Sequence, residues 1–136
     1  MVKASEEHLV APLLYLTVRQ TNSVPLSVIH RLKTYYQVNL KRNIQRLHRL
    51  GSWLKALEAD HIPVVVLKGC HLAEAVYKNV GARVFCDADL LVRSEDMDRA
   101  HRCLMEVAAF SPESGFEVDL HWYLDDILNP DLERVW

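Results

Sequence analysis

The stretch Asp87-Ala88-Asp89-Leu90-Leu91-Val92 largely decides how this chain is interpreted, because it places two carboxylates within an apolar run. The residues from Val84 to Val92 are typical of a strand. Side chains two residues apart on a strand project from the same face, so Asp87 and Asp89 should point to one side. Two carboxylates held this close repel each other unless water, a cation or a basic group lies beside them. They are either exposed aspartates or ligands of a metal ion.

Short elements of alternating type flank this stretch. Ile62 to Leu67 is a β-branched run typical of a buried strand, and residues 71–78 return to helical spacing. A helix from Ser94 to about Ala109 follows the aspartates, and Phe116 to Trp122 alternates as a third strand should. This order predicts an α/β (α+β) unit.

The first half of the chain is predicted to be helical. Ser5 is a candidate N-cap for a first helix, and the pattern from Leu26 to about Asp60 predicts a long second one. We expect this long helix to bend or break near Val38-Asn39 or at Gly51. Its apolar stripe consists of Ile44, Leu47, Leu50, Leu54 and Leu57. We therefore divide the chain into a helical N-terminal extension, 1–61, and an α/β core, 62–136, that together form one compact unit.

Composition limits the classes to which this chain can belong. Its 136 residues are half hydrophobic and a quarter charged, which is ordinary for one globular domain. A formal net charge of −2 disfavours long nucleic acid as a partner. The apolar runs are too short to span a bilayer, and the acidic N-terminus is unlike a signal peptide. Three cysteines without a CxxC pair fit a reduced protein, so we expect a cytoplasmic location.

A third acid could complete the site. Asp119 lies in the alternating run Val118-Asp119-Leu120-His121-Trp122, and it would join Asp87 and Asp89 if the two strands are neighbours. Three converging carboxylates suit Mg²⁺, or Mn²⁺ in its place, because hard cations prefer oxygen ligands. His121 shares a face with Asp119. It is either an auxiliary residue near the metal or a histidine packed in the core beside Trp122.

Three residues upstream are candidates for binding phosphate. Lys68 and Gly69 lie where the first strand should meet a helix, and backbone N–H groups at a helix N-terminus bind anions. Gly69 would let a phosphate approach closely, while Lys68 either adds its charge or is an ordinary surface lysine. Arg83 precedes the aspartates, so it either contacts a phosphate or forms an ion pair with Asp87 or Asp89.

Taken together, these motifs resemble a known family. The segments that carry the resemblance are Leu67-Lys68-Gly69, Leu72-Ala73, Tyr77, Gly81-x-Arg83, Asp87-x-Asp89-Leu90-Leu91-Val92 and Val118-Asp119-Leu120-His121-Trp122. In this order they are similar to the uncharacterised bacterial nucleotidyltransferase-like family of the polymerase-beta-type nucleotidyltransferase superfamily. The resemblance covers about Ile62 to Leu124, and the helical part more loosely.

The resemblance implies a minimal nucleotidyltransferase fold, a small mixed sheet with flanking helices and an N-terminal helical extension. It implies that Asp87 and Asp89 bind the metal, that Asp119 is the third catalytic carboxylate and that Gly69 is the turn glycine. It further implies Mg²⁺-dependent transfer of a nucleoside monophosphate from an NTP to the hydroxyl of an acceptor that the sequence does not name.

Two other functions are compatible with the sequence. The segment 110–115 is shorter than in most members of the family, and those members usually continue past Trp136. A truncated or catalytically inactive nucleotidyltransferase-fold binding module is therefore one alternative. The other is an interaction protein that binds a protein partner through the helical region 26–60, which includes Tyr35, Tyr36 and Trp53.

Overall fold

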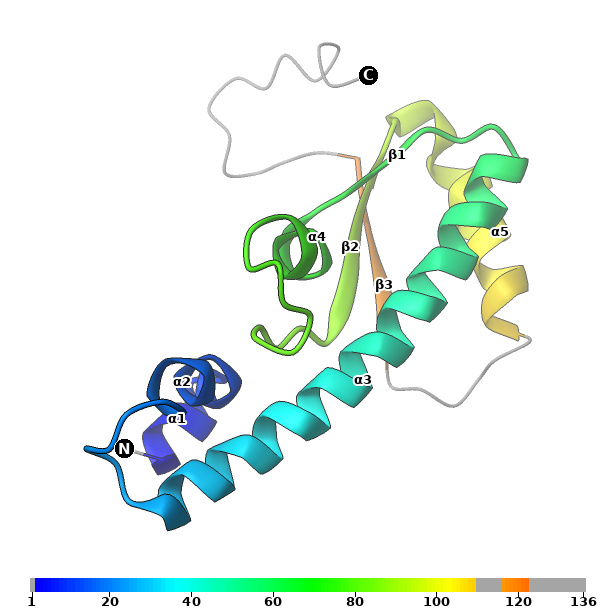
Figure 1. Ribbon diagram of the computed structural model, residues 1–136. Coiled ribbons are helices and arrows are strands. Elements are labelled where there is room, and N and C mark those ends of the chain that lie inside the picture. Colours follow the sequence, from blue (N-terminus) through cyan, green and yellow to red (C-terminus); the bar gives the residue numbers. More distant parts are fainter. Residues whose placement is uncertain (1, 110–115, 123–136) are drawn as a thin grey trace, which may run out of the picture.

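A computed structural model of this chain describes residues 2–109 and 116–122, and Figure 1 shows how its elements are arranged. In chain order these elements are α1 (Val2–Glu7), α2 (Ala11–Val18), α3 (Leu26–Ala59), β1 (Val64–Val66), α4 (Lys68–Ala75), β2 (Asp87–Val92), the 3-10 turn η1 (Ser94–Asp96), α5 (Met97–Ala109) and β3 (Glu117–His121). The predicted mixture of helices and one small sheet is confirmed. The short segment 110–115 and the end at Trp136 lie outside the described residues.

The three strands form one mixed sheet in the order β1-β2-β3. β1 pairs antiparallel with β2, where Val65 lies opposite Leu91. β3 pairs parallel with β2, where Asp89 lies opposite Asp119 and Leu91 opposite His121. The strand with the two aspartates is therefore central, and the strand with the third acid is its direct neighbour, which meets the condition for Asp119 to approach Asp89.

Alternation along the strands separates apolar from acidic side chains. Ala88 and Leu90 of β2 are fully buried, and Val118 and Leu120 of β3 pack against the same core. The helices contribute the other side of that core, with Leu50, Trp53 and Leu57 from α3, Cys70 and Ala73 from α4, and Ala100, Cys103 and Leu104 from α5. The intervening residues of β2 and β3 carry the acids on the opposite face of the sheet.

The long helix forms as predicted but without the expected break. α3 is continuous from Leu26 to Ala59, through both Val38-Asn39 and Gly51. A single glycine costs a helix only about 1 kcal/mol, and the buried neighbours Leu50 and Trp53 anchor α3 on either side of Gly51. Figure 1 shows α1 and α2 against the N-terminal part of α3, and α5 and the sheet beside its C-terminal part.

The beginning of the chain differs from the prediction. Ser5 is not an N-cap, because it lies inside α1 and its Oγ donates a hydrogen bond to the carbonyl oxygen of Val2, at 2.7 Å. The chain then turns at Leu9, whose φ of 57° is left-handed, and α2 begins at Ala11. Pro12 lies in the first turn of α2, where its missing N–H has no intrahelical partner to lose. The proline therefore accounts for two short helices in place of one.

The central strand is shorter than the predicted range of Val84 to Val92, since β2 begins at Asp87. The backbone just before β2 is held by side chains of α3 and not by pairing within the sheet. Asn39 Nδ2 donates to the carbonyl oxygens of Gly81 and Arg83, each at 3.0 Å. Asn43 Nδ2 donates to the carbonyl oxygens of Val80, at 2.6 Å, and Arg83, at 2.7 Å. The two aspartates consequently lie at the start of the strand.

Two further predictions can be compared with the fold. None of the described helices combines the length and the apolar character that crossing a membrane requires. All three cysteines are free thiols, with Cys70 and Cys103 buried and Cys86 exposed. The division between 1–61 and 62–136 stays a prediction, as does the cytoplasmic location.

Candidate functional site

The pairing of β2 with β3 brings two carboxylates together. Asp89 and Asp119 lie directly opposite each other on neighbouring parallel strands, which are about 4.8 Å apart. His121 lies two residues beyond Asp119, and a side chain two residues along a strand projects from the same face. The same face of the sheet therefore presents two acids and an imidazole within a small area.

These three residues form what we call the acidic cluster: Asp89, Asp119 and His121. His121 Nε2 lies 3.0 Å from Asp89 Oδ1 and 3.5 Å from Asp119 Oδ2. One ligand atom from each residue lies within 4.8 Å of the other two. Asp89 is 4% exposed, whereas Asp119 is open to solvent. The cluster thus joins a buried carboxylate to one that a ligand can reach.

Lys68 supplies the positive charge beside the buried carboxylate. Its Nζ lies 2.6 Å from Asp89 Oδ1, the same oxygen that accepts a hydrogen bond from His121. Burial by itself would raise the pKa of Asp89, but the hydrogen bonds from Lys68 and His121 outweigh it and hold that pKa below 3.8. Asp89 is therefore ionised at neutral pH, as a metal ligand must be.

All three predicted carboxylates raise the pKa of the Lys68 ammonium. Its pKa is raised above 10.5, first by the hydrogen bond to Asp89 and then by the negative charges of Asp89, Asp119 and Asp87, while burial acts in the opposite direction. One cationic group is thus stabilised by all three acids at once. The predicted metal site of Asp87, Asp89 and Asp119 stays a prediction.

Asp87 lies on the same strand but outside the acidic cluster. It is the exposed first residue of β2 and lies opposite Glu117, two pairs before the pair of Asp89 and Asp119. Two residues along a strand correspond to about 6.6 Å, so its carboxylate is displaced from the other two. Its role as a metal ligand stays a prediction.

His121 belongs to the acidic cluster, where it touches both carboxylates. The sequence left two interpretations of it, one of them a core histidine beside Trp122. Trp122 is 55% exposed, so it offers no core for His121 to pack in. The alternation Asp119-Leu120-His121 was the signal for its position in the cluster, and its auxiliary role stays a prediction.

Gly69 occupies the turn position that the sequence predicts, at the start of α4 directly after β1. A Cβ atom added there would lie only 2.6 Å from the Cβ atom of Phe85. Close packing against Phe85 therefore accounts for a glycine at this position, independently of any phosphate. Binding of phosphate by the backbone of Gly69 stays a prediction.

Among the described residues, Arg83 forms no ion pair with Asp87 or Asp89. Instead its carbonyl oxygen accepts the hydrogen bonds from Asn39 and Asn43, and its buried Nε has no hydrogen-bond partner within the part of the chain that the structure describes. The phosphate-binding role of Arg83 stays a prediction. Sequence analysis missed the two asparagines, whose spacing of four residues on the inner side of α3 was the available signal.

The acidic cluster fits a divalent cation. Oxygen ligands bind Mg²⁺ at 2.0–2.1 Å in octahedral geometry, so adjacent ligand atoms are about 3 Å apart. The separations of 3.0 and 3.5 Å from His121 Nε2 to the two carboxylates are close to this value. Two carboxylates suit Mg²⁺ or Mn²⁺, and the imidazole makes Mn²⁺ an equally suitable ion. Within the described part of the chain, Asp89, Asp119 and His121 are the group whose ligand atoms lie close enough together to hold one metal ion.

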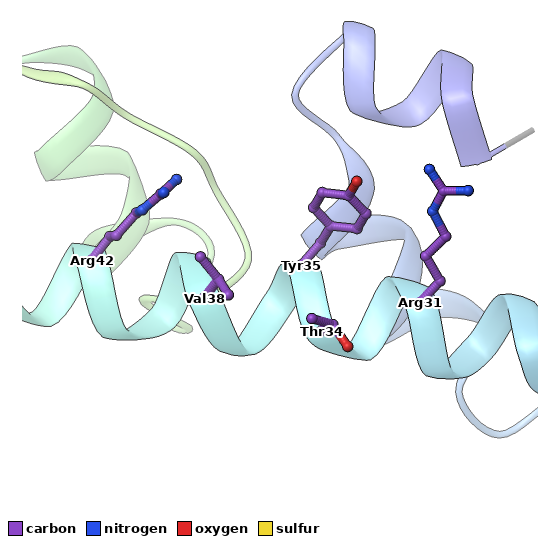
Figure 2. Close-up of a pocket in the computed structure, with 5 residues that line it drawn as sticks. All are labelled: Arg31, Thr34, Tyr35, Val38 and Arg42. Atoms are coloured by element: carbon purple, nitrogen blue, oxygen red, sulfur yellow. The ribbon is translucent and has the colours of Figure 1, made fainter.

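Two hollows elsewhere on the surface do not include the acidic cluster. One is lined by Arg49, Trp53, His101, Leu104, Met105, Phe116, Glu117, Val118 and Leu120, and thus lies on the helix side of β3. The other lies along the N-terminal half of α3, and Figure 2 shows its lining residues Arg31, Thr34, Tyr35, Val38 and Arg42 projecting from that helix. The second hollow falls within the region 26–60, and its use by a protein partner stays a prediction.

The small mixed sheet, its flanking helices and the paired acids on neighbouring strands are consistent with a nucleotidyltransferase fold. The chain belongs to the uncharacterised nucleotidyltransferase family, whose model matches residues 1–136. Comparison with curated proteins and with solved structures finds no match. The family inferred from the motifs is thereby confirmed, while its bacterial origin stays a prediction. Membership supports nucleotidyl transfer as the general kind of activity and implies NTP substrates.

Proposed function

We propose that this chain transfers a nucleoside monophosphate from an NTP to an acceptor hydroxyl, with Mg²⁺ or Mn²⁺ bound by Asp89 and Asp119. The observation that carries the proposal is the direct pairing of these two acids on neighbouring strands, next to His121. Asp87 stands beside them as a further ligand. A divalent cation bound there would neutralise charge on the phosphates and so favour attack by the hydroxyl.

Different residues of the chain are suited to different parts of the transfer reaction. The acceptor oxygen attacks the α-phosphorus, the bond from that phosphorus to the bridging oxygen breaks, and pyrophosphate leaves. The proton of the hydroxyl needs a base, and Asp119 is suited to accept it because it is the exposed carboxylate of the acidic cluster. Asp89 is suited to hold the metal, since it is buried and kept ionised. The backbone N–H groups at the start of α4 are suited to the phosphates.

The first test measures binding. Mg²⁺ together with an NTP should raise the melting temperature of the wild-type chain, because a ligand that binds only the folded state stabilises it by about 2.7 kcal/mol at 100 times its Kd. The double variant Asp89→Asn with Asp119→Asn should lose this gain. Asp98→Asn, an exposed aspartate on α5, is the matched control and should respond like wild type.

A double variant that is stabilised as much as wild type would show that the metal does not bind at this cluster. The melting temperatures without ligand show whether each variant is folded, so a loss of response can be separated from a loss of structure.

The alternative is an inactive binding module with the same fold. Incubation with each NTP labelled at the α-phosphate, followed by detection of labelled acceptor or released pyrophosphate, separates the two. Turnover that disappears in Asp119→Asn supports the enzyme. Stabilisation by Mg²⁺ and NTP without turnover across protein, sugar, small-molecule and RNA acceptors supports the binding module.

A further inference from the structure

We propose that Lys68 is an internal cation that occupies the metal site of the free chain, and that metal and nucleotide bind cooperatively because its ammonium must move from Asp89 to the nucleotide phosphates. The inference rests on the proposed function, since it concerns the same acidic cluster. It adds a step that neither the family nor the cluster implies, namely an exchange of one cation for another.

The geometry places Lys68 where a metal would bind. Its Nζ lies 2.6 Å from Asp89 Oδ1, and His121 Nε2 lies 3.0 Å from that same oxygen. The Asp89 side chain is only 6% exposed, so it depends on these donors and not on water for its neutralisation. A metal ion bound by Asp89 would have to replace at least one of them.

Electrostatic repulsion prevents the Lys68 ammonium and a divalent metal ion from contacting Asp89 at the same time. The carboxylate that Lys68 contacts lies directly opposite Asp119 on the neighbouring strand, so the ammonium is placed beside a pair of acids. A divalent ion at that point would repel an ammonium group in contact with the same carboxylate. The Lys68 side chain is 61% exposed, so it can move away without losing a packed environment.

The backbone at Lys68 has an unusual conformation, which it shares with Leu9, His61 and Lys78. Lys68 has a φ of 47°, in the left-handed region where glycine is relaxed and other residues are strained. Strained residues of this kind are concentrated at functional sites. A lysine is nevertheless found here, with its ammonium in contact with the buried acid.

Displacement of Lys68 would link metal binding to nucleotide binding. Without a nucleotide, the metal competes with the ammonium for Asp89. With a nucleotide, the displaced ammonium gains phosphate oxygens as new partners at the start of α4. Each ligand should then increase the affinity of the other by the same factor.

The test compares binding of Mn²⁺ to wild type, Lys68→Met and Lys78→Met, with free Mn²⁺ measured by electron paramagnetic resonance. Lys78 is the matched control, because it is exposed and its φ is 49°. We expect Lys68→Met to bind Mn²⁺ alone about tenfold more tightly than wild type, since it lacks the competing ammonium. With the Mn²⁺ that the analogue itself binds subtracted, a non-hydrolysable NTP analogue should strengthen Mn²⁺ binding by a larger factor in wild type and Lys78→Met than in Lys68→Met.

The outcomes of this experiment distinguish the cation exchange from the metal site itself. If Lys68→Met binds Mn²⁺ no more tightly than wild type, the exchange is refuted while the metal site stands. If wild type and Lys68→Met both fail to bind Mn²⁺, with and without the analogue, the proposed function is refuted as well. Melting curves establish that the variants are folded. Lys68→Gly, which removes the ammonium and relaxes the backbone, replaces Lys68→Met if the latter does not fold.

Discussion

Cys70 illustrates how a single residue near the acidic cluster is constrained. Its thiol is buried and lies 3.5 Å from the carbonyl oxygen of Asp87, to which it donates. Burial is the main reason that its pKa rises to about 11, and the charges of Asp87 and Asp89 add to the effect. Cys70 therefore serves packing at the start of β2, and it is not a reactive thiol.

This environment predicts the pattern of thiol labelling. At pH 8, iodoacetamide should modify exposed Cys86 more than about a hundredfold faster than Cys70, because access is blocked and little thiolate forms. Peptide mass spectrometry of timed samples measures both rates. Cys86→Ser is the control and should lose the fast phase. Rapid modification of Cys70 in the folded chain would contradict the structure.

At the scale of elements, the start of α4 is fixed by close packing against the segment that precedes β2. The position of Gly69 has room for hydrogen only, because Phe85 lies against it. Phe85 in turn belongs to the core, where Arg46 of α3 lies over its ring and donates to its carbonyl oxygen. This contact holds Lys68, the first residue of α4, in reach of β2.

Substitution of two glycines should therefore have opposite effects. Gly69→Ala should lower the free energy of unfolding by about 1–3 kcal/mol, since its Cβ atom would overlap that of Phe85. Gly51→Ala should raise it by about 0.5–1 kcal/mol, because nothing lies within 4 Å of the added atom and alanine favours the helix. Urea unfolding curves of both variants and wild type measure these differences. A neutral Gly69→Ala would mean that Phe85 can move aside.

For the whole molecule, α3 is the element that connects the N-terminal helices to the sheet. Its Asn43 is fully buried, and both of its hydrogen bonds reach carbonyl oxygens of the loop that leads into β2. Tyr36, which lies nearer the N-terminus of α3, donates to Asn79 Oδ1 in the same loop, at 3.1 Å. The orientation of β2 is thus tied to residues some 40 positions earlier in the chain.

Asn43→Asp should therefore be costly for the molecule as a whole. A carboxylate has no N–H to donate, and it would place a charge against the carbonyl oxygens of Val80 and Arg83, so the free energy of unfolding should fall by at least about 2 kcal/mol. Gln45→Glu makes the same chemical change at an exposed position of α3 and should be nearly neutral. Thermal unfolding of both variants at pH 7 measures the difference. Equal stabilities would show that these hydrogen bonds contribute little.

Much of the fold followed from local patterns. The periodicity of residues 26–60 predicted α3, the β-branched run before Lys68 predicted β1, and alternation predicted the strands that contain Asp89 and Asp119. Such patterns depend on neighbours in the sequence, so they can be recognised without tertiary structure. The division into two helices at Leu9, ahead of Pro12, and the unbroken course of α3 through Gly51 were not predicted. Both depend on a balance between a local penalty and packing that only the folded chain provides.

The sequence by itself determined the class of the protein, because the order of its motifs led to the nucleotidyltransferase family that the whole chain matches. It also determined which acids could act, since alternation on a strand assigns Asp87, Asp89 and Asp119 to faces. Only the tertiary structure decided how these groups combine. The register of β2 against β3 placed Asp89 opposite Asp119, and it gave His121 a position in the cluster that Asp87 does not share. The packing of α4 then brought Lys68 to Asp89, because contacts between residues distant in sequence depend on how the elements pack and not on local pattern.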